Sequence, residues 1–508
     1  MRAPAVLVAF ALVACRSAPA PKPAAHVPAT AASTAVAAPD RWQVPVPGPP
    51  PALQVPAQRH FQLANGLKVR LVEYHRLPIV ALYLVVDAGA WHDPEGKPGL
   101  ASFTAAMMTE GTRRRSATQI SDDLGFIGAS LGAGAGFDSA SLSGAALSAK
   151  LDALLDIFAD VLVEPAFPPA DFRRVQDERL VSLVQQRDQP GAVAAKAFAA
   201  LYWGDHPYGH WLMGTERSVK AITRADLVAF HRERWRPGNS ELVVVGDVTQ
   251  AELEPRLERA LAEWKGAATP GRLPPAAQPP KLRTVLIRKR GPAPQAFVMM
   301  GMPGLARSSP DYVSARVAFE VLGGGSSSRL FRDLREKHGY TYGIYSRVDA
   351  RKLGGTGFIV GSVRSDVTGA ATRALLEEVR GMRDQPVPEP ELKVARDALQ
   401  LSLPAQFAQA AGIAGKLADE VVYGLPDDYW DRYAEQLSRV TAEEVQRASR
   451  KYLDLGGLTT VMVCDPAVVK PQLAGLPLGE IEVRPAPGVA ATARGTASRR
   501  PVEVSPSR

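Results

Sequence analysis

Alternating hydrophobic and polar positions predict a β-hairpin near the start of the folded part of the chain. Apolar side chains alternate on both sides of an Asn-Gly pair at residues 65–66, at positions Phe61, Leu63, Leu67, Val69 and Leu71. Asn-Gly between two alternating stretches is a strong signal for a tight hairpin turn. The continuous apolar stretch 79–86 follows and predicts a buried strand.

Two later stretches predict helices. Residues 99–112 follow a loop at residues 93–98 that contains Pro and Gly, and they are predicted to form a helix that begins there. Residues 151–162 carry apolar side chains at Leu151, Leu154, Leu155, Phe158 and Leu162. This spacing is that of a helix that buries one face.

The end of the first half of the chain is repeated at the end of the second half. Residues 218–247 align without a gap with residues 436–465. Thr223 and Thr441 are 218 positions apart, and so are the final residues, Asp247 and Asp465. In both copies the threonine precedes a helix with acidic residues in its first turn, which is a favourable helix start. We therefore predict a duplicated α/β unit, joined by the Pro-, Gly- and Ala-rich residues 266–280.

Length and composition fit two globular domains. The 508 residues are too many for one core and suit two domains of about 200 residues each. Hydrophobic residues make up 46% of the chain and charged residues 22%, which is ordinary for a globular protein. The net charge is +8, but Lys and Arg are scattered rather than gathered in a run. We therefore predict no nucleic-acid partner.

The first residues have the pattern of a targeting segment. Residues 1–14 combine a positive start with a short apolar stretch, and small residues precede Cys15. Residues 12–15, Leu-Val-Ala-Cys, resemble the bacterial lipobox, which implies a signal peptide cleaved after residue 14 and lipidation of Cys15. The alternative is an ordinary cleaved signal or a chance match. Arg16 follows, where an aspartate would favour the inner membrane, so we expect a cell-envelope lipoprotein at the outer membrane, facing the periplasm.

Segments of linker composition flank the predicted domains. Residues 15–56 are predicted to form a disordered Ala- and Pro-rich tether, and residues 485–508 a disordered tail. The second cysteine, Cys464, lies in an apolar stretch and is predicted to be a buried strand residue. With Cys15 acylated, the mature chain can form no internal disulfide.

Glycine-rich motifs in the chain do not predict a nucleophile or a nucleotide site. Residues 128–132 have the form G-x-S-x-G with Ser130 at the centre, but a helix-like stretch precedes them and a strand follows. A nucleophile elbow needs the reverse order. The glycines at 132–136 and 323–325 lack the Gly-Lys-Ser/Thr of a phosphate loop.

One pair of histidines has the spacing of metal ligands on a helix. His206 and His210 stand four residues apart, with Pro207 and Gly209 between them. These two residues forbid a regular helix, so we expect a loop in which His206 bonds to backbone.

Several short motifs occur in a fixed order along the chain. They are Gly99-Leu100-Ala101, Glu110-Gly111-Thr112, Asp205-His206-Pro207-Tyr208-Gly209, Gly214-Thr215, residues 243–247, residues 322–331, Leu334-Arg335-Glu336-Lys337 and Gly339-Tyr340-Thr341-Tyr342-Gly343. In this order and spacing they resemble the insulinase/pitrilysin family of zinc metallopeptidases, in its two-domain bacterial and mitochondrial-processing form, over residues 57–480. The resemblance implies an α+β fold of two homologous domains, residues 57–265 and 281–484. Each domain is expected to be a mostly antiparallel sheet backed by helices, and the two to be arranged as a clamshell.

The resemblance points to a metal site whose ligands are missing. The family binds zinc through an H-x-x-E-H motif on the helix at residues 99–112, and the matching places hold Ser102, Ala105 and Ala106. The family's third ligand, a glutamate ahead of an Asp-x-Pro, matches Ser182. Alanine can neither bind zinc nor transfer a proton, and a serine hydroxyl is a poor zinc ligand. We therefore expect no metal cofactor in this chain.

The part of the family's site that touches substrate is retained. The resemblance assigns Arg335 and Tyr342 to a pair that contacts the substrate carbonyl, where two such donors stabilise the developing oxyanion. The alternative is a solvated helix arginine and an ordinary strand tyrosine. Gly132 and Ala133 match the family's backbone site for a peptide that adds as a strand; the alternative there is a flexible strand without a ligand.

Some members of the family that the chain resembles work as heterodimers, in which one subunit carries H-x-x-E-H and the other has lost it but donates the Arg/Tyr pair. The resemblance therefore implies a non-catalytic subunit of a heterodimeric zinc peptidase. A homologous partner with H-x-x-E-H would hold the zinc, and this chain would bind unstructured peptide and donate Arg335 and Tyr342. The alternative is a peptide-binding or scaffold lipoprotein without enzymatic function. A peptidase that is active alone through a different site is a third possibility.

Overall fold

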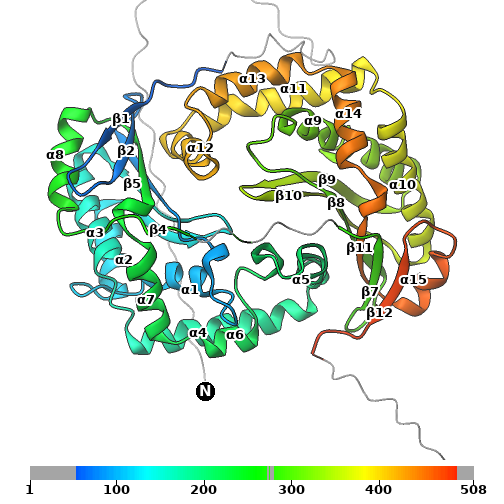
Figure 1. Ribbon diagram of the computed structural model, residues 1–508, viewed down its shortest axis with the longest axis horizontal. Coiled ribbons are helices and arrows are strands. Elements are labelled where there is room, and N and C mark those ends of the chain that lie inside the picture. The colour runs from blue at the N-terminus through cyan, green and yellow to red at the C-terminus, as the bar shows by residue number, and fades with distance from the viewer. Residues whose placement is uncertain (1–52, 272–273, 275–279, 489–508) are drawn as a thin grey trace, which may run out of the picture. The chain divides into compact units, whose positions relative to one another are not determined.

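The hairpin around Asn65-Gly66 opens the first of two six-stranded sheets, as predicted (Figure 1). The computed structural model describes residues 53–271, 274 and 280–488. The first sheet has the spatial order β1-β2-β6-β3-β5-β4. Its strands are β1 (Arg59–Gln62), β2 (Lys68–Glu73), β3 (Ile79–Val86), β4 (Ser130–Ala135), β5 (Ala140–Leu147) and β6 (Ser240–Gly246). Neighbouring strands are antiparallel except β2 and β6, which are parallel.

The second sheet uses the later half of the chain and has the order β12-β7-β11-β8-β10-β9. Its strands are β7 (Arg283–Arg288), β8 (Gln295–Pro303), β9 (Thr341–Arg351), β10 (Gly354–Arg364), β11 (Thr459–Cys464) and β12 (Glu480–Arg484). β7 pairs in parallel with β11 and β12, and the remaining neighbours are antiparallel. The prediction of an α+β fold with mostly antiparallel sheets is confirmed.

Helices account for most of the other described residues. In the first half they are α1 (Leu100–Met108), α2 (Ala117–Ile127), α3 (Leu151–Val163), α4 (Pro169–Gln185), α5 (Pro190–Trp203), α6 (Glu216–Ala221), α7 (Arg224–Arg234) and α8 (Gln250–Ala260). In the second half they are α9 (Tyr312–Gly323), the π-helix Phe331–Lys337, α10 (Thr368–Asp384), α11 (Glu389–Gln406), α12 (Ala410–Tyr423), α13 (Tyr429–Arg439), α14 (Ala442–Tyr452) and α15 (Pro466–Gln472). Short 3-10 helices lie at Ala90–His92, Ser148–Lys150, Gln186–Asp188, Pro207–Gly209, Pro237–Asn239, Ser365–Val367 and Leu455–Gly457.

The duplicated unit predicted from the constant offset is present in both halves. Thr223 and Thr441 cap α7 and α14 in the same way, each accepting a hydrogen bond from the backbone N–H three residues on, at Asp226 and Glu444. The strands that follow these helices, β6 and β11, both lie inside their sheets. Equivalent sequences therefore occupy equivalent places in the two sheets.

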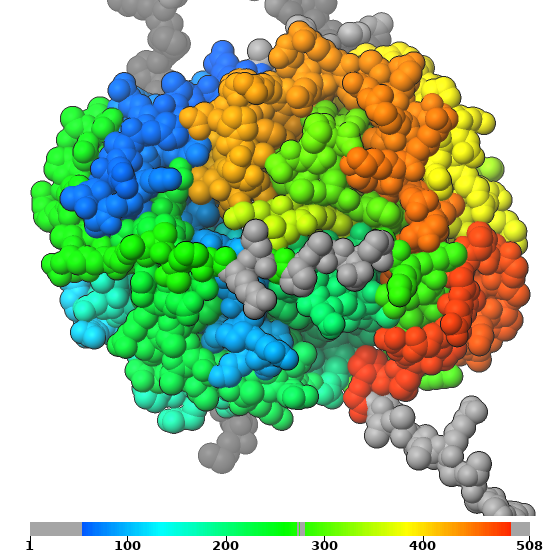
Figure 2. All heavy atoms as spheres, viewed as in Figure 1, coloured from blue at the N-terminus to red at the C-terminus, as the bar shows by residue number. Residues whose placement is uncertain are grey.

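Each half also contributes one helix to the sheet of the other half. α5 packs on β8 and β11, and α12 packs on β3 and β6 (Figure 1). The Tyr202 hydroxyl of α5 bonds to the carbonyl oxygens of Met302 and Gly355, at 3.2 and 3.3 Å. In Figure 2, the surface of α12 (orange) adjoins that of β1 and β2 (blue), where Arg70 of β2 bonds to Glu420 of α12 at 3.1 Å. The exchanged helices tie the two halves together.

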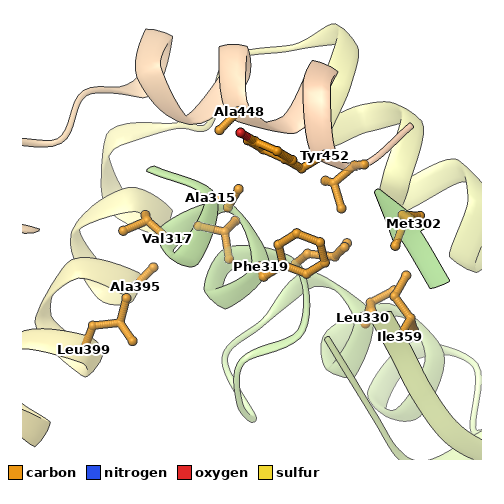
Figure 3. Packing of buried hydrophobic residues seen from close by; sticks show 14 of the residues in the cluster. Met302, Ala315, Val317, Phe319, Leu330, Ile359, Ala395, Leu399, Ala448 and Tyr452 are labelled. Atoms are coloured by element: carbon orange, nitrogen blue, oxygen red, sulfur yellow. The ribbon is translucent and has the colours of Figure 1, made fainter. Parts of the chain in front are cut away.

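The core of the second half is built around Phe319. Figure 3 shows its ring pointing from α9 into a cluster that includes Met302, Leu330 and Ile359. A Cβ atom on Gly357 of β10 would stand 2.2 Å from this ring, so a strand glycine makes the room that the phenyl group fills. The cluster joins helices and strands that are far apart in sequence.

Some predictions on the ends of the chain lie outside the described residues, namely the signal peptide, Cys15 and residues 489–508. Leu53 and Val55, which the composition places in the tether, are half-buried against the core of the second half. Cys464 is a buried residue of β11, as predicted, and burial raises the pKa of its thiol to about 12. Among the described helices, none has the length and apolar character needed to span a membrane.

Candidate functional site

α1 begins where the sequence predicts the helix of the lost zinc motif. The buried Asp93 carboxylate accepts hydrogen bonds from the backbone N–H groups of Gly99 and Ala101, at 2.6 and 2.7 Å. A carboxylate at this end satisfies free N–H groups and opposes the positive end of the helix dipole. Gly99 has a φ of 98°, a left-handed conformation that favours glycine. The motif Pro-Gly-Leu-Ala therefore fixes the helix start.

The residues of α1 that match the zinc ligands are packed against, or hydrogen-bonded to, other parts of the protein. Ala105 is fully buried in the hydrophobic core of the first half, while Ser102 and Ala106 are half-buried. The Ser102 hydroxyl donates to the carbonyl oxygen of Leu212 at 2.5 Å. This bond uses the hydroxyl proton to join α1 to the loop that follows Pro207–Gly209.

A buried arginine of α4 lies against the same serine. Arg179 Nη1 donates to Ser102 Oγ at 3.1 Å, and Nη2 donates to the Ser102 carbonyl oxygen at 2.7 Å. The guanidinium carbon lies 4.6 Å from the centroid of the Phe103 ring, a cation–π distance. Burial lowers the pKa of Arg179 to about 10, with the Asp93 carboxylate opposing that shift, so the guanidinium is charged at neutral pH.

These residues do not fit a zinc ion. Zinc in proteins takes thiolate, imidazole or carboxylate ligands, and the four matching positions offer two hydroxyl groups and two methyl groups, from Ser102, Ser182, Ala105 and Ala106. The buried positive charge of Arg179 adds repulsion toward a second cation. Within the described part of the chain, no group of three His, Cys, Asp or Glu side chains could hold a metal.

His206 and His210 lie in a loop, as predicted. Nδ1 of the buried His206 accepts a hydrogen bond from the backbone N–H of Tyr208 at 3.1 Å, which confirms the predicted backbone bond. His210 Nε2 lies 3.5 Å from the Asp93 carboxylate. The two imidazoles therefore have different partners and serve the local structure.

The structure brings Arg335 and Tyr342 together, although seven positions separate them. Arg335 lies in the π-helix Phe331–Lys337 and Tyr342 near the start of β9. The guanidinium carbon lies 4.5 Å from the Tyr342 ring centroid and 4.6 Å from that of Phe331. Tyr342 is 80% exposed and Arg335 is half-buried, so the phenol hydroxyl stands on the surface beside the guanidinium.

A β-bulge directs Tyr342 outward. Thr341 pairs with Val363 of β10 and Gly343 pairs with Ser362, so Tyr342 is an extra residue without a partner in the ladder. The buried Thr341 hydroxyl bonds to the Ser362 carbonyl oxygen at 2.6 Å and accepts from the Gly343 N–H at 2.9 Å. Bulges commonly redirect one side chain, and this one places the phenol beside Arg335.

Gly132 and Ala133 lie in β4, which forms one edge of the first sheet. β4 pairs with β5 on one side, and none of the described strands pairs with its other side. A Cβ atom on Gly132 would meet no atom within 4 Å, so there is open space above this residue. An open edge is the feature that strand addition requires. Ser130 begins this strand and α2 precedes it, the order that excludes a nucleophile elbow.

Arg179 is the site residue that the sequence analysis missed. The buried side chains of α4 are Val175, Arg179 and Leu183, spaced four residues apart. Ser182, the place of the third ligand by count, is half-buried beside this stripe. The i, i+4 spacing of two apolar residues around an arginine is the signal that could have identified it.

Family models match most of the folded chain. Residues 68–216 match the model described as insulinase (peptidase family M16), and residues 221–399 match the peptidase M16 inactive domain. An uncharacterized zinc protease of Mycobacterium tuberculosis is 26% identical over 412 residues, which cover 78% of this chain and 91% of that protein. An uncharacterized zinc protease of Streptomyces coelicolor is 26% identical over 297 residues, 57% of this chain and 64% of that protein.

Solved structures have the same fold. The peptidase M16 inactive domain from Pseudomonas fluorescens is 30% identical with a TM-score of 0.75, and the match covers 80% of this chain and 97% of that one. A protease from Helicobacter pylori, 19% identical over 80% of this chain and 99% of its own, also has a TM-score of 0.75 and supports the fold alone. The chain therefore belongs to the insulinase family of peptidases, peptidase family M16.

Proposed function

We propose that this chain is the non-catalytic subunit of a two-subunit zinc peptidase. A homologous partner with H-x-x-E-H would hold the zinc and the general base. The observation that carries the proposal is the contrast between two places in one chain. The zinc-ligand positions of α1 hold Ser102, Ala105 and Ala106, whereas Arg335 and Tyr342 are assembled as a pair whose tyrosine is exposed.

The chemistry of the pair suits the stabilisation of an oxyanion. A guanidinium and a phenol hydroxyl would donate to the carbonyl oxygen of the peptide bond as negative charge develops on it. The ring of Tyr342 orients the guanidinium of Arg335 by the cation–π contact, and the bulge orients Tyr342. Because both groups are already placed, little reorganisation is needed when a partner approaches.

The open edge of β4 would hold an unstructured peptide as an added strand. Gly132 and Ala133 would contribute backbone N–H and C=O groups, so binding would depend little on the side chains of the substrate. We further propose that lipidation of Cys15 anchors the chain at the outer membrane, on its periplasmic side, through the tether. Mass spectrometry of the N-terminal peptide from a bacterial membrane fraction tests this part independently: an unmodified Cys15 would contradict it.

The main experiment combines this chain with a homologue that carries H-x-x-E-H and measures the cleavage of an unstructured peptide. Arg335→Ala and Tyr342→Phe are expected to lower kcat by about 10²-fold, as the loss of one oxyanion donor typically does. Arg332→Ala on the same π-helix and Tyr345→Phe on the same strand are the matched controls and should keep full activity. Full activity of both Arg335→Ala and Tyr342→Phe would show that the pair has no role in trans.

A second function, a peptide-binding or scaffold lipoprotein, needs only the open edge of β4. That edge is present whether or not a partner exists. A pull-down of the native protein distinguishes the two, because recovery of an H-x-x-E-H subunit supports the peptidase. Peptide binding by the chain alone, without such a subunit, supports the scaffold.

A further inference from the structure

A positively charged side chain lies at the positions of α1 and α4 that match the family's zinc ligands. In the family, the zinc ligands come from these two helices, and Arg179 connects the same two helices here. Its guanidinium bonds to both oxygen atoms of Ser102, which is the position of the first ligand. A positive charge thus stands beside the place where the family has a metal ion.

Within the described residues, no ion pair balances this charge directly. Among the described residues, none of the salt bridges includes Arg179. The Asp93 carboxylate, whose charge attracts the guanidinium, is itself committed to the N–H groups of Gly99 and Ala101. The guanidinium is instead stabilised by the two oxygen atoms of Ser102 and by the face of the Phe103 ring.

We infer that Arg179 is the resident cation of this site: it joins α4 to α1 in place of a metal, and it excludes zinc even when the ligands are restored. The inference concerns this chain alone and goes beyond its proposed function, because it holds for a scaffold as well as for a peptidase subunit.

The register of α4 strengthens the exclusion. Arg179 and Ser182 are three residues apart on one helix, a spacing at which opposite charges pair. A glutamate placed at residue 182 therefore has a guanidinium within reach and would form an ion pair with it. Restoring the third ligand thus supplies a counter-ion to Arg179 rather than a ligand to zinc.

The test restores the family's metal site with and without the arginine. The restoring changes are Ser102→His, Ala105→Glu, Ala106→His and Ser182→Glu. A second variant adds Arg179→Met, which keeps the apolar stem of the side chain and removes its charge. A control adds Arg174→Met instead, at an exposed arginine of the same helix. Zinc is measured by elemental analysis after dialysis and by competition with a chelator, and folding by circular dichroism.

We expect zinc affinity to be at least about 10²-fold higher in the variant that lacks Arg179 than in the restored variant and in the Arg174→Met control, as for the removal of a charge beside a metal. Equal affinity with and without Arg179 would overturn the exclusion.

A second measurement covers the case in which the restored variants do not fold. Arg179→Met in the otherwise unchanged chain should lower the Tm by several degrees, whereas Arg179→Lys keeps the charge and should recover part of the loss. A chelator should leave the Tm of the natural chain unchanged. An unchanged Tm of Arg179→Met would show that the arginine does not join the helices.

Discussion

The guanidinium carbon of Arg335 lies 4.5 Å from the ring centroid of Tyr342, and the ring belongs to the one residue of β9 that a bulge leaves without a partner. The relationship depends on Thr341, whose buried hydroxyl bonds across the bulge to the Ser362 carbonyl oxygen. A buried threonine thus positions an exposed tyrosine, which in turn positions an arginine. None of these contacts buries the hydroxyl of Tyr342, because its side chain is 80% exposed.

Thr341→Val should therefore weaken the action of the pair without removing either member. Valine has nearly the same shape but cannot bond to the Ser362 carbonyl oxygen or accept from the Gly343 N–H. We expect a loss of about 1–3 kcal/mol in stability and a fall of about tenfold in kcat with the partner subunit, as for a displaced donor. Thr341→Ser, which keeps the hydroxyl, is the control and should keep kcat. Equal kcat for Thr341→Val and the natural chain would contradict the positioning role.

Peptide binding at β4 can be tested on the ligand rather than on the protein. Backbone bonds along the edge of an antiparallel strand involve alternate residues. A peptide N-methylated at one set of alternate positions should therefore bind about tenfold or more weakly, while methylation of the intervening positions should have little effect. Fluorescence anisotropy of labelled peptides measures this. An equal effect of both methylation patterns would argue against strand addition at residues such as Gly132 and Ala133.

Local patterns in the sequence predicted the elements well, for physical reasons that involve few residues. The hairpin around Asn65-Gly66 follows from turn chemistry, and the caps at Thr223 and Thr441 follow from a side chain that bonds three residues ahead. The constant offset between the copies predicted a duplicated unit, and five strands of each sheet do follow the same order, β2-β6-β3-β5-β4 and β7-β11-β8-β10-β9. The turn and the caps depend on a few neighbouring residues, and the repeat is visible within the chain. One sequence is therefore enough to detect them.

Contacts between distant segments were not predictable in the same way. Nothing in α5 alone indicates that it covers β8 and β11 of the other half, because an apolar helix packs equally well on either sheet. The role of Arg179 likewise depends on which α1 residue faces α4, and only the packed helices show that this residue is Ser102. The bulge at Tyr342 arises from the register of β9 on β10, which the sequence of β9 does not contain.

Because α5 packs closely on the second sheet, one glycine of that sheet should not tolerate a larger side chain. A Cβ atom on Gly301 of β8 would stand 2.0 Å from the ring of Phe198, which is buried between α5 and the sheet. Gly301→Ala should therefore destabilise the protein by about 1–3 kcal/mol, as overpacking of a core does. Gly132→Ala, at a strand glycine with open space, is the control in thermal unfolding. Recovery of stability in Gly301→Ala combined with Phe198→Leu would locate the clash, and an unchanged Tm of Gly301→Ala would contradict it.

The contact between α12 and β2 contains more carboxylates than its cation can balance. Arg70 bonds to Glu241, to Glu420 at 3.1 Å and to Asp427 at 2.9 Å, and Gln58 donates to Glu420 at 3.1 Å. The Glu420 side chain is fully buried, and its Oε1 atom has no hydrogen-bond partner among the described residues. Burial, together with the nearby charges of Asp427 and Asp419, raises the pKa of Glu420 to about 8, against the hydrogen bond from Gln58 and the attraction of Arg70.

This raised pKa predicts that the contact weakens as the pH rises from about 4.5 to about 8. The folded chain keeps a proton on Glu420 that the unfolded chain releases near pH 4.5, the ordinary value of the carboxyl group. The stabilisation is therefore complete below that pH and is lost as the pH rises through about 8. Glu420→Gln, which is neutral at every pH and keeps the bond from Gln58, should show a Tm that rises relative to the natural chain between about pH 6 and pH 9.

The difference in Tm between Glu420→Gln and the natural chain isolates this group, because histidines and other carboxyl groups titrate alike in both proteins. Asp427→Asn tests the effect of the neighbouring charge. It removes the carboxylate that repels Glu420 and that also pairs with Arg70 and His60. In that variant the weaker repulsion and the freed Arg70 both favour the ionised carboxylate, so the Glu420 pKa should be lower than in the natural chain. The loss of stability should therefore be smaller and should end at a lower pH. A difference in Tm between Glu420→Gln and the natural chain that stays constant from about pH 6 to pH 9 would exclude Glu420 as the titrating group.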